Sequence, residues 1–143
     1  MTEMKRIVHR EQVLAIILPA SYRPEGIEFV TEPESTMQLA AMRHKAGHLI
    51  KPHAHNPVSR NILYTQEALI VRSGKVRADL YSPEQEYVES HVLGPGDVIL
   101  LIAGGHGFEV LEDLDMVEIK QGPFIGEADK TRFAGRPPSR IQP

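Results

Sequence analysis

The sequence predicts an all-β domain, built as a sandwich or barrel of short strands. Eleven glycines and eleven prolines interrupt the 143 residues, and no long segment keeps the apolar period of an amphipathic helix. Short apolar and β-branched runs lie between these breaks, at a spacing typical of strands joined by turns. A chain of this length has room for one compact domain.

The expected strands follow one another along the chain. They cover residues 13–18, 26–31, 39–43, 49–55, 67–72, 76–81, 87–93, 98–102, 108–111 and 116–121. A hairpin turn is expected at Ser73-Gly74 and another turn at residues 94–97, because the glycines there suit tight turns. The run 98–102 is apolar throughout, which indicates a strand covered on both faces.

The rest of the chain predicts little regular structure. Only residues 11–15 and 127–133 suit short helical turns. Residues 135–143 contain three prolines, a composition typical of a mobile tail. We therefore expect a single domain over residues 1–134, followed by this tail.

Composition and charge exclude several classes of protein. The chain has 16 basic and 19 acidic residues, a net charge of −3, which argues against a nucleic-acid binder held by phosphate contacts. It has seven histidines and no cysteine, so disulfides and thiolate sites are excluded and any metal must take nitrogen and oxygen ligands. No apolar run is as long as a membrane span, and we expect a cytoplasmic protein with no membrane partner.

Two histidines and a carboxylate form the densest chemical signal. His53 and His55 are two residues apart, so in an extended strand both imidazoles leave the same face. Glu67 begins the next expected strand and shares its face with Leu69 and Val71, which puts a carboxylate at the mouth of an apolar surface. A divalent cation would satisfy both the paired imidazoles and the buried carboxylate.

A fourth candidate ligand lies further along the chain. His106 stands in Gly104-Gly105-His106-Gly107, directly after the apolar run 98–102. The flanking glycines allow the backbone to approach its neighbours closely and leave the imidazole free to point inward. The remaining histidines (His9, His44, His48 and His91) are expected to be ordinary surface or core residues.

These residues resemble the motifs of the cupin superfamily, small β-barrels with a metal site. The first motif is Gly, five residues, His-x-His, three or four residues, Glu, six residues, Gly. Its counterparts here are Gly47, His53, His55, Glu67 and Gly74, with eleven residues between His55 and Glu67. The second motif is matched by Gly96, Gly104 and His106, although Ile102 replaces its proline, His106 comes one residue early and its asparagine is missing. The motif region spans residues 47–106.

The resemblance implies a fold, a cofactor and a range of functions. The fold is a single-domain cupin-type β-barrel, or jelly roll. Its metal, held by His53, His55, Glu67 and His106, would be manganese, iron, nickel, cobalt or zinc. The function would be that of an oxygenase or isomerase acting on a small organic molecule inside the barrel. The alternative is a non-catalytic module that binds or senses a small molecule, for example one derived from a carbohydrate.

Residues near the predicted ligands are candidates for a substrate pocket. They are Arg43, Tyr64, Gln66, Lys120 and Gln121. Only one of two neighbouring residues on a strand can face inward, and an inward Arg43 or Lys120 would favour an anionic substrate. Residues 56–66, inserted between two ligands, would form either a lid over the barrel mouth or a plain connection.

The N-terminal strands suggest an assembly. The expected strands 13–18 and 27–30 are apolar and lie outside the motif region, so they would present unpaired edges unless covered. We therefore expect a two-fold homodimer in which these strands meet the partner.

Overall fold

The computed structural model describes residues 3–136 and 138–143 and has an all-β fold, as predicted. Residues 1 and 2 of the expected domain, and residue 137 of the expected tail, lie outside the described residues. Within the described part there is no α-helix, and one 3-10 turn, η1 (Gly126–Asp129), overlaps the segment 127–133 that was expected to suit a helical turn. The strands are β1 (Lys5–His9), β2 (Gln12–Leu18), β3 (Gly26–Phe29), β4 (Ala40–Arg43), β5 (Glu67–Tyr81), β6 (Tyr87–Leu93), β7 (Val98–Leu101), β8 (Gly105–Lys120) and β9 (Ile141–Gln142).

The chain forms two compact units. The larger one comprises Met1–Tyr22 and Thr65–Pro143, and the smaller one is Arg23–Tyr64. The smaller unit contains the β3–β4 hairpin, followed by a long irregular segment. None of the described residues belongs to a helix long and apolar enough to cross a bilayer.

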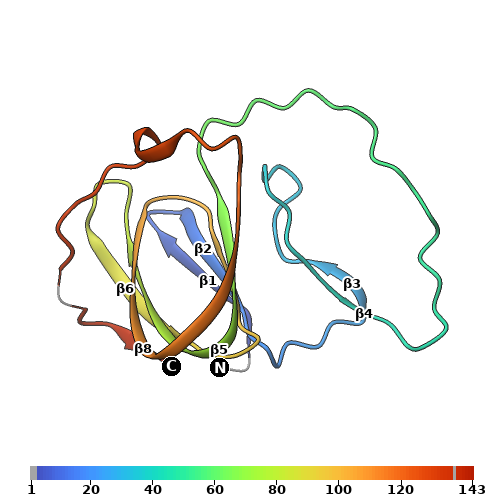
Figure 1. Cartoon of the computed structure of the whole chain (residues 1–143), viewed down its shortest axis with the longest axis horizontal. Helices are drawn as coiled ribbons and strands as arrows, with labels where there is room; N and C mark the ends of the chain where they lie inside the picture. Colours follow the sequence, from blue (N-terminus) through green and yellow to red (C-terminus); the bar gives the residue numbers. More distant parts are fainter. Residues whose placement is uncertain (1–2, 137) are drawn as a thin grey trace. The chain divides into compact units, whose positions relative to one another are not determined.

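The larger unit is a single, strongly curled sheet. Its strand order is β1-β2-β7-β5-β6-β9, and β8 pairs with the other edge of β5. The first half of β5 pairs with β7 and the second half with β6, whereas β8 runs antiparallel along the whole of β5. Figure 1 shows β5 and β8 bending together, so that the two halves of the sheet face each other. The predicted barrel is therefore present as a curled half-barrel.

The core fills the space between the two facing halves. In β5, Leu69 and Val71 on one side of the bend and Val76 and Leu80 on the other are buried. Side chains from the neighbouring strands complete the cluster: Ile7, Leu14, Ala15, Ile17, Ala78, Val88, Leu93, Ile99 and Leu101. Strand β7 is buried at three of its four residues, which confirms the expectation that both of its faces are covered.

The bend occurs at Gly74, where the sequence pattern predicted a hairpin turn. That expectation is wrong, because β5 continues through Ser73 and Gly74 without reversing. The φ angle of Gly74 is +84°, and a Cβ atom there would collide with the backbone carbonyl oxygen of Asp113 in β8. The register between the two strands shifts on both sides of Ser73, so the local irregularity is a bulge that bends the strand. The expected strands 108–111 and 116–121 are accordingly parts of one strand, β8.

Three other local expectations are corrected. Residues 11–15 form no helical turn, because Arg10 and Glu11 have φ angles of 48° and 66° and make the turn between β1 and β2. Strand β1 was missed, since its charged residues hide a short alternating pattern. The expected strand 49–55 is absent, and residues 44–66 contain no strand.

The homodimer was expected because strand 13–18 would have an unpaired edge, but the corresponding strand, β2, has no free edge. It pairs with β1 on one side and β7 on the other. The second strand in that argument, β3, pairs with β4. The homodimer stays a prediction that now lacks this support.

The expected tail is held against the larger unit. Strand β9 pairs in parallel with β6. The hydroxyl oxygen of Tyr87 accepts a hydrogen bond from the Arg140 amide at 3.1 Å, and that of Tyr81 accepts one from the Arg136 amide at 3.2 Å. Two tyrosine side chains on adjacent strands therefore fix the backbone of this segment.

A first prediction concerns the bend. Replacing Gly74 by alanine should destabilise the protein by at least about 2 kcal/mol, because the new Cβ atom meets the Asp113 carbonyl in a left-handed conformation. Chemical denaturation of the full chain measures this difference. The control is Gly107→Ala in β8, where a Cβ atom would meet nothing within 4 Å. Equal stability of both variants would contradict the bend.

A second prediction compares a buried ion pair with an exposed one. Asp79 accepts hydrogen bonds from Arg77 at 2.8 Å and from Ser90 at 2.5 Å, and both charged side chains are less than 15% exposed. Asp79→Ala should cost about 2 kcal/mol, because Arg77 and Ser90 lose a buried acceptor, although Arg77 keeps its exposed partner Glu109 at 2.6 Å. Asp115→Ala, which breaks a solvent-exposed pair with Arg72 of the same 2.8 Å length, should change stability little.

The pH dependence of this effect has a defined sign. Burial raises the pKa of Asp79, but the hydrogen bonds from Arg77 and Ser90 outweigh burial and hold that pKa below its usual value. The carboxylate therefore contributes its full stability above the unfolded-state pKa of about 3.9, and loses it as the pH falls through the folded-state value. The gap between wild type and Asp79→Ala should be constant at neutral pH and shrink in acid. A gap that widens below pH 4 would refute this assignment.

Candidate functional site

Two of the predicted ligands meet at the ends of the bent β5–β8 pair. Glu67 is the first residue of β5, and its side chain is 11% exposed. His106 is the second residue of β8, and its side chain is 33% exposed. The Nε2 atom of His106 lies 2.6 Å from the Oε1 atom of Glu67. Because the two residues lie at opposite ends of the paired strands, only the bend brings them into contact.

The turn before His106 is positioned by Gly104. Its φ angle is +75°, and a Cβ atom would collide with the backbone carbonyl oxygen of Tyr81, the last residue of β5. The turn therefore passes directly against the end of β5, as the glycine pattern predicted. The imidazole of His106 then lies beside the Phe108 ring, with 5.6 Å between ring centroids.

Hydrogen bonds give Glu67 a strongly stabilised negative charge. The hydrogen bond with His106 lowers the pKa of Glu67 from 4.5 to about 2; burial opposes this, and Glu118 and Lys120 add to it. The proximity of Glu67 raises the pKa of Glu118, since two carboxylates close together repel each other. Glu67 is therefore the ionised member of this carboxyl pair, and it accepts the hydrogen bond from His106.

The end of β8 supplies a cation to the same surface. Lys120 pairs directly with Glu67 across the strands, and directly opposed residues point to the same face. Its Nζ atom lies 3.8 Å from Glu118 Oε1. Of the neighbours Lys120 and Gln121, Lys120 is therefore the one that shares the face of Glu67, while the Gln121 side chain donates to the carbonyl of Gly122.

The other predicted pocket residues are Gln66 before β5, and Arg43 and Tyr64 in the smaller unit. Gln66 is buried just before β5, where its carbonyl accepts a hydrogen bond from the Gln121 amide at 3.0 Å. Arg43 ends β4 in the smaller unit and is exposed, and Tyr64 is 74% exposed.

His53 and His55 meet within the smaller unit. Their ring centroids are 5.4 Å apart at an interplanar angle of 73°, so the two rings lie on the same side although the segment is not a strand. Both residues are exposed. His53 Nδ1 lies 2.9 Å from the Lys51 carbonyl oxygen; this contact requires Nδ1 to carry the proton, which leaves the Nε2 lone pair available to a metal.

The structure thus brings the predicted ligands together as two pairs. Glu67 and His106 form one pair in the larger unit, and His53 and His55 form the other in the smaller unit. The convergence of both pairs on one ion stays a prediction.

One residue of the Glu67 cluster was missed in the sequence. The alternation of side chains in the strand that contains Glu118 is visible in the sequence. Which face of the sheet Glu118 lies on is defined only by the pairing of β8 with β5. A period-2 pattern shows that Glu118 and Lys120 share a face; it does not show that this face carries Glu67.

Two further histidines contact carboxylates. His91 is 1% exposed, and its Nε2 atom lies 2.7 Å from Glu89 Oε1 on the same strand. His9, Glu84 and Glu86 form a group whose ligand atoms all lie within 4.8 Å of one another. Both carboxylates of that group are exposed, and Arg10 lies 3.8 Å from Glu86, so an existing cation already compensates part of its charge.

Comparison with known proteins adds no relative. No family model matches the chain, and neither a curated protein nor a solved structure matches it. The resemblance to cupins therefore depends on the motif residues alone.

A third prediction tests the Glu67–His106 contact directly. A double-mutant cycle of Glu67→Ala and His106→Ala, measured by denaturation with a chelator present, should give a coupling energy of about 1–2 kcal/mol. The comparison pair is His9 and Glu86, whose atoms are 3.7 Å apart with Glu86 56% exposed, and its coupling should be smaller. Additive effects at Glu67 and His106 would show that the two side chains do not interact.

Proposed function

We propose that this chain is a cupin-type protein that binds a divalent transition metal ion and, next to it, a small organic molecule at the rim of its curled sheet. The observation that carries the proposal is the 2.6 Å contact between Glu67 and His106. A carboxylate oxygen and an imidazole nitrogen from the two ends of a bent strand pair meet at the rim of an apolar core.

The donor set fits such an ion. Imidazole and carboxylate are ligands for manganese, iron, cobalt, nickel and zinc. The lowered pKa of Glu67 keeps its carboxylate ionised at neutral pH, as a ligand must be. Without an ion, His106 satisfies this carboxylate by donating to it, and an ion held by both side chains would replace that hydrogen bond.

His53 and His55 complete the proposed set. They form a preassembled imidazole pair, and His53 has a tautomer that leaves Nε2 available. A bound divalent cation would supply Lewis-acid stabilisation of negative charge on the substrate. The chain itself contributes the partly buried Phe108 ring beside His106 and the Lys120 ammonium, which attracts an anionic group.

Two functions follow from this arrangement. The enzymatic one is an oxygenase or isomerase acting on the bound molecule. The other is a binding or sensing module without turnover. Both require the same metal at the same rim of the sheet, so metal binding is tested first and turnover second.

A fourth prediction measures the metal. The full chain, prepared without an affinity tag and dialysed against each metal in turn, should retain about one ion per chain by elemental analysis. Glu67→Gln and His106→Ala should each weaken the affinity by more than about tenfold, because each removes a ligand. Calorimetric titration gives the affinities.

Matched controls separate ligands from neighbouring pairs. Glu89→Gln alters the similar contact with His91 and should keep the wild-type affinity. His44→Ala is the control for His53→Ala, since His44 stacks on His48 at 4.0 Å in the same unit. Unchanged affinity in both Glu67→Gln and His106→Ala overturns the metal proposal, whereas loss in these two but not in His53→Ala rejects the four-ligand set alone.

Turnover separates the two functions. The metal-loaded chain is incubated with small organic acids, phenols and sugar nucleotides, with and without oxygen. Conversion that disappears in Glu67→Gln supports the enzyme, and saturable binding without conversion supports the sensing module.

A further inference from the structure

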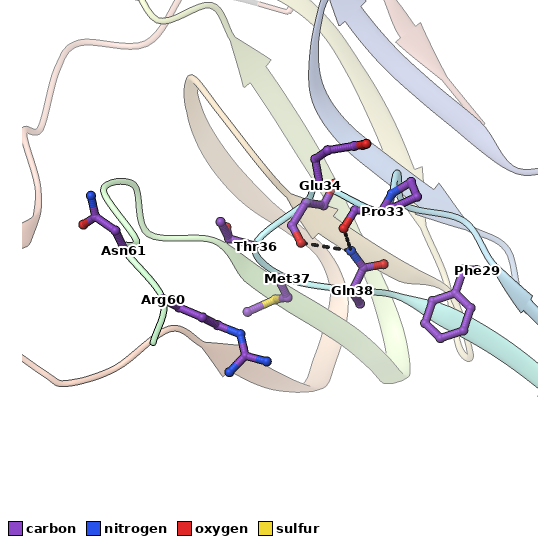
Figure 2. A pocket seen from close by; sticks show the side chains of 9 residues that line it. Phe29, Pro33, Glu34, Thr36, Met37, Gln38, Arg60 and Asn61 are labelled. Carbon is purple, nitrogen blue, oxygen red and sulfur yellow. Dashed lines mark hydrogen bonds between the residues drawn. The ribbon is translucent and has the colours of Figure 1, made fainter. Parts of the chain in front are cut away.

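The smaller unit contains a pocket that involves none of the proposed metal ligands. It has a volume of about 700 Å³ and is formed by the end of β3, the loop that follows it, and two residues of the inserted segment, Arg60 and Asn61. This size lies within the range of small-molecule sites, about 300–1,000 Å³. Figure 2 shows Arg60 and Phe29 on either side of Met37 and Gln38.

The wall of this pocket is held in place by the Gln38 side chain. Its amide nitrogen donates to the carbonyl oxygens of Glu32 and Ser35, both at 2.9 Å, and its amide oxygen accepts from the Thr31 hydroxyl at 2.7 Å. The Thr31 hydroxyl oxygen in turn accepts from the Leu39 amide at 3.1 Å. This hydrogen-bond network therefore fixes the loop before any ligand arrives, which lowers the entropy cost of binding.

The lining combines an available cation with an apolar surface. Arg60 forms no ion pair or hydrogen bond with the described residues, whereas Arg72, Arg77 and Arg132 each pair with a carboxylate. Phe29 is 64% exposed although it ends a strand, and Met37 lies between it and Arg60. A guanidinium suits a carboxylate bidentately, and an exposed ring suits a flat apolar group.

The one acidic lining residue selects among anions. Glu34 also borders the pocket, and in Figure 2 its side chain extends to the side away from Arg60. Its charge disfavours a dianion such as a phosphate monoester more than it disfavours a singly charged carboxylate.

We infer that this pocket binds a small apolar carboxylate, whose charged group pairs with Arg60 and whose ring lies on Phe29 and Met37. The inference goes beyond the proposed metal function and is independent of it, because neither Glu67 nor His106 lines the pocket.

A fifth prediction tests this pocket with benzoate. Amide resonances of the isotope-labelled full chain are followed by NMR during titration in the presence of a chelator. Benzoate should shift residues 36–38 and 60–61 saturably, with a Kd of about 1 mM, as expected for a small fragment. Benzamide, which has the same ring without the charge, should bind at least about tenfold more weakly.

Variants and competing ligands determine the outcome. Arg60→Gln should weaken benzoate binding about tenfold, while Lys51→Gln, which removes an exposed cation of the same unit outside the pocket, should not. Phe29→Ser should remove the preference for benzoate over acetate. Glu67→Gln should bind benzoate normally, so failure of the metal proposal leaves this one intact. Benzoate binding that survives Arg60→Gln, or phenyl phosphate binding more tightly than benzoate, overturns the inference.

Discussion

The bend at Gly74 is the constraint on which the larger unit depends. A straight strand of 15 residues would be about 50 Å long, and its ends would lie on opposite sides of the molecule. Because Gly74 has a positive φ angle and no Cβ atom, β5 turns sharply against the Asp113 carbonyl without losing its partner β8. The two halves of one sheet then face each other, their apolar side chains form a single core, and the first residue of β5 reaches the beginning of β8.

Ion pairs between β5 and β8 lie on the outer face of the sheet near this bend. On either side of Gly74, Arg72 pairs with Asp115 and Lys75 with Glu112, and Arg77 further along pairs with Glu109. Each exposed pair is weak on its own. Together they favour the observed register, because a one-residue slip would separate each cation from its carboxylate at the place where the bulge interrupts the inner apolar pattern. The inner face therefore supplies most of the stability, and the outer face helps to define the register.

Local patterns predicted the elements whose pairing is local. The bounds of β6 were predicted without error, and those of β7 to within one residue, since apolar content and flanking glycines define both. The same-side arrangement of His53 and His55 follows from their spacing even though the segment is not a strand. Gly104 beside His106 was correctly interpreted as a point of close backbone approach.

The failures at the bend and at Glu118 have a shared physical cause, which is that the partner lies far away in the sequence. Ser73-Gly74 between two apolar runs has the signature of a hairpin, and a glycine bulge has the same signature; only the pairing with β8 decides between them. Residues 49–55 suit a strand but have no partner strand. Glu118 was missed for the same reason, because Glu67 lies on another strand.

The long pairing of β5 with β8 also determines how the chain must fold. Strands β6 and β7 lie between them in the sequence, so no tight turn can start the pairing and extend it residue by residue. Both strands must first be held by their neighbours. A large loop therefore has to close, at a cost in chain entropy, before the contacts between β5 and β8 can offset that cost. Chains dominated by such non-local pairing fold in milliseconds to seconds, slower than helical bundles. Glu67 and His106, at the outermost ends of the pairing, would come into contact among the last events of folding.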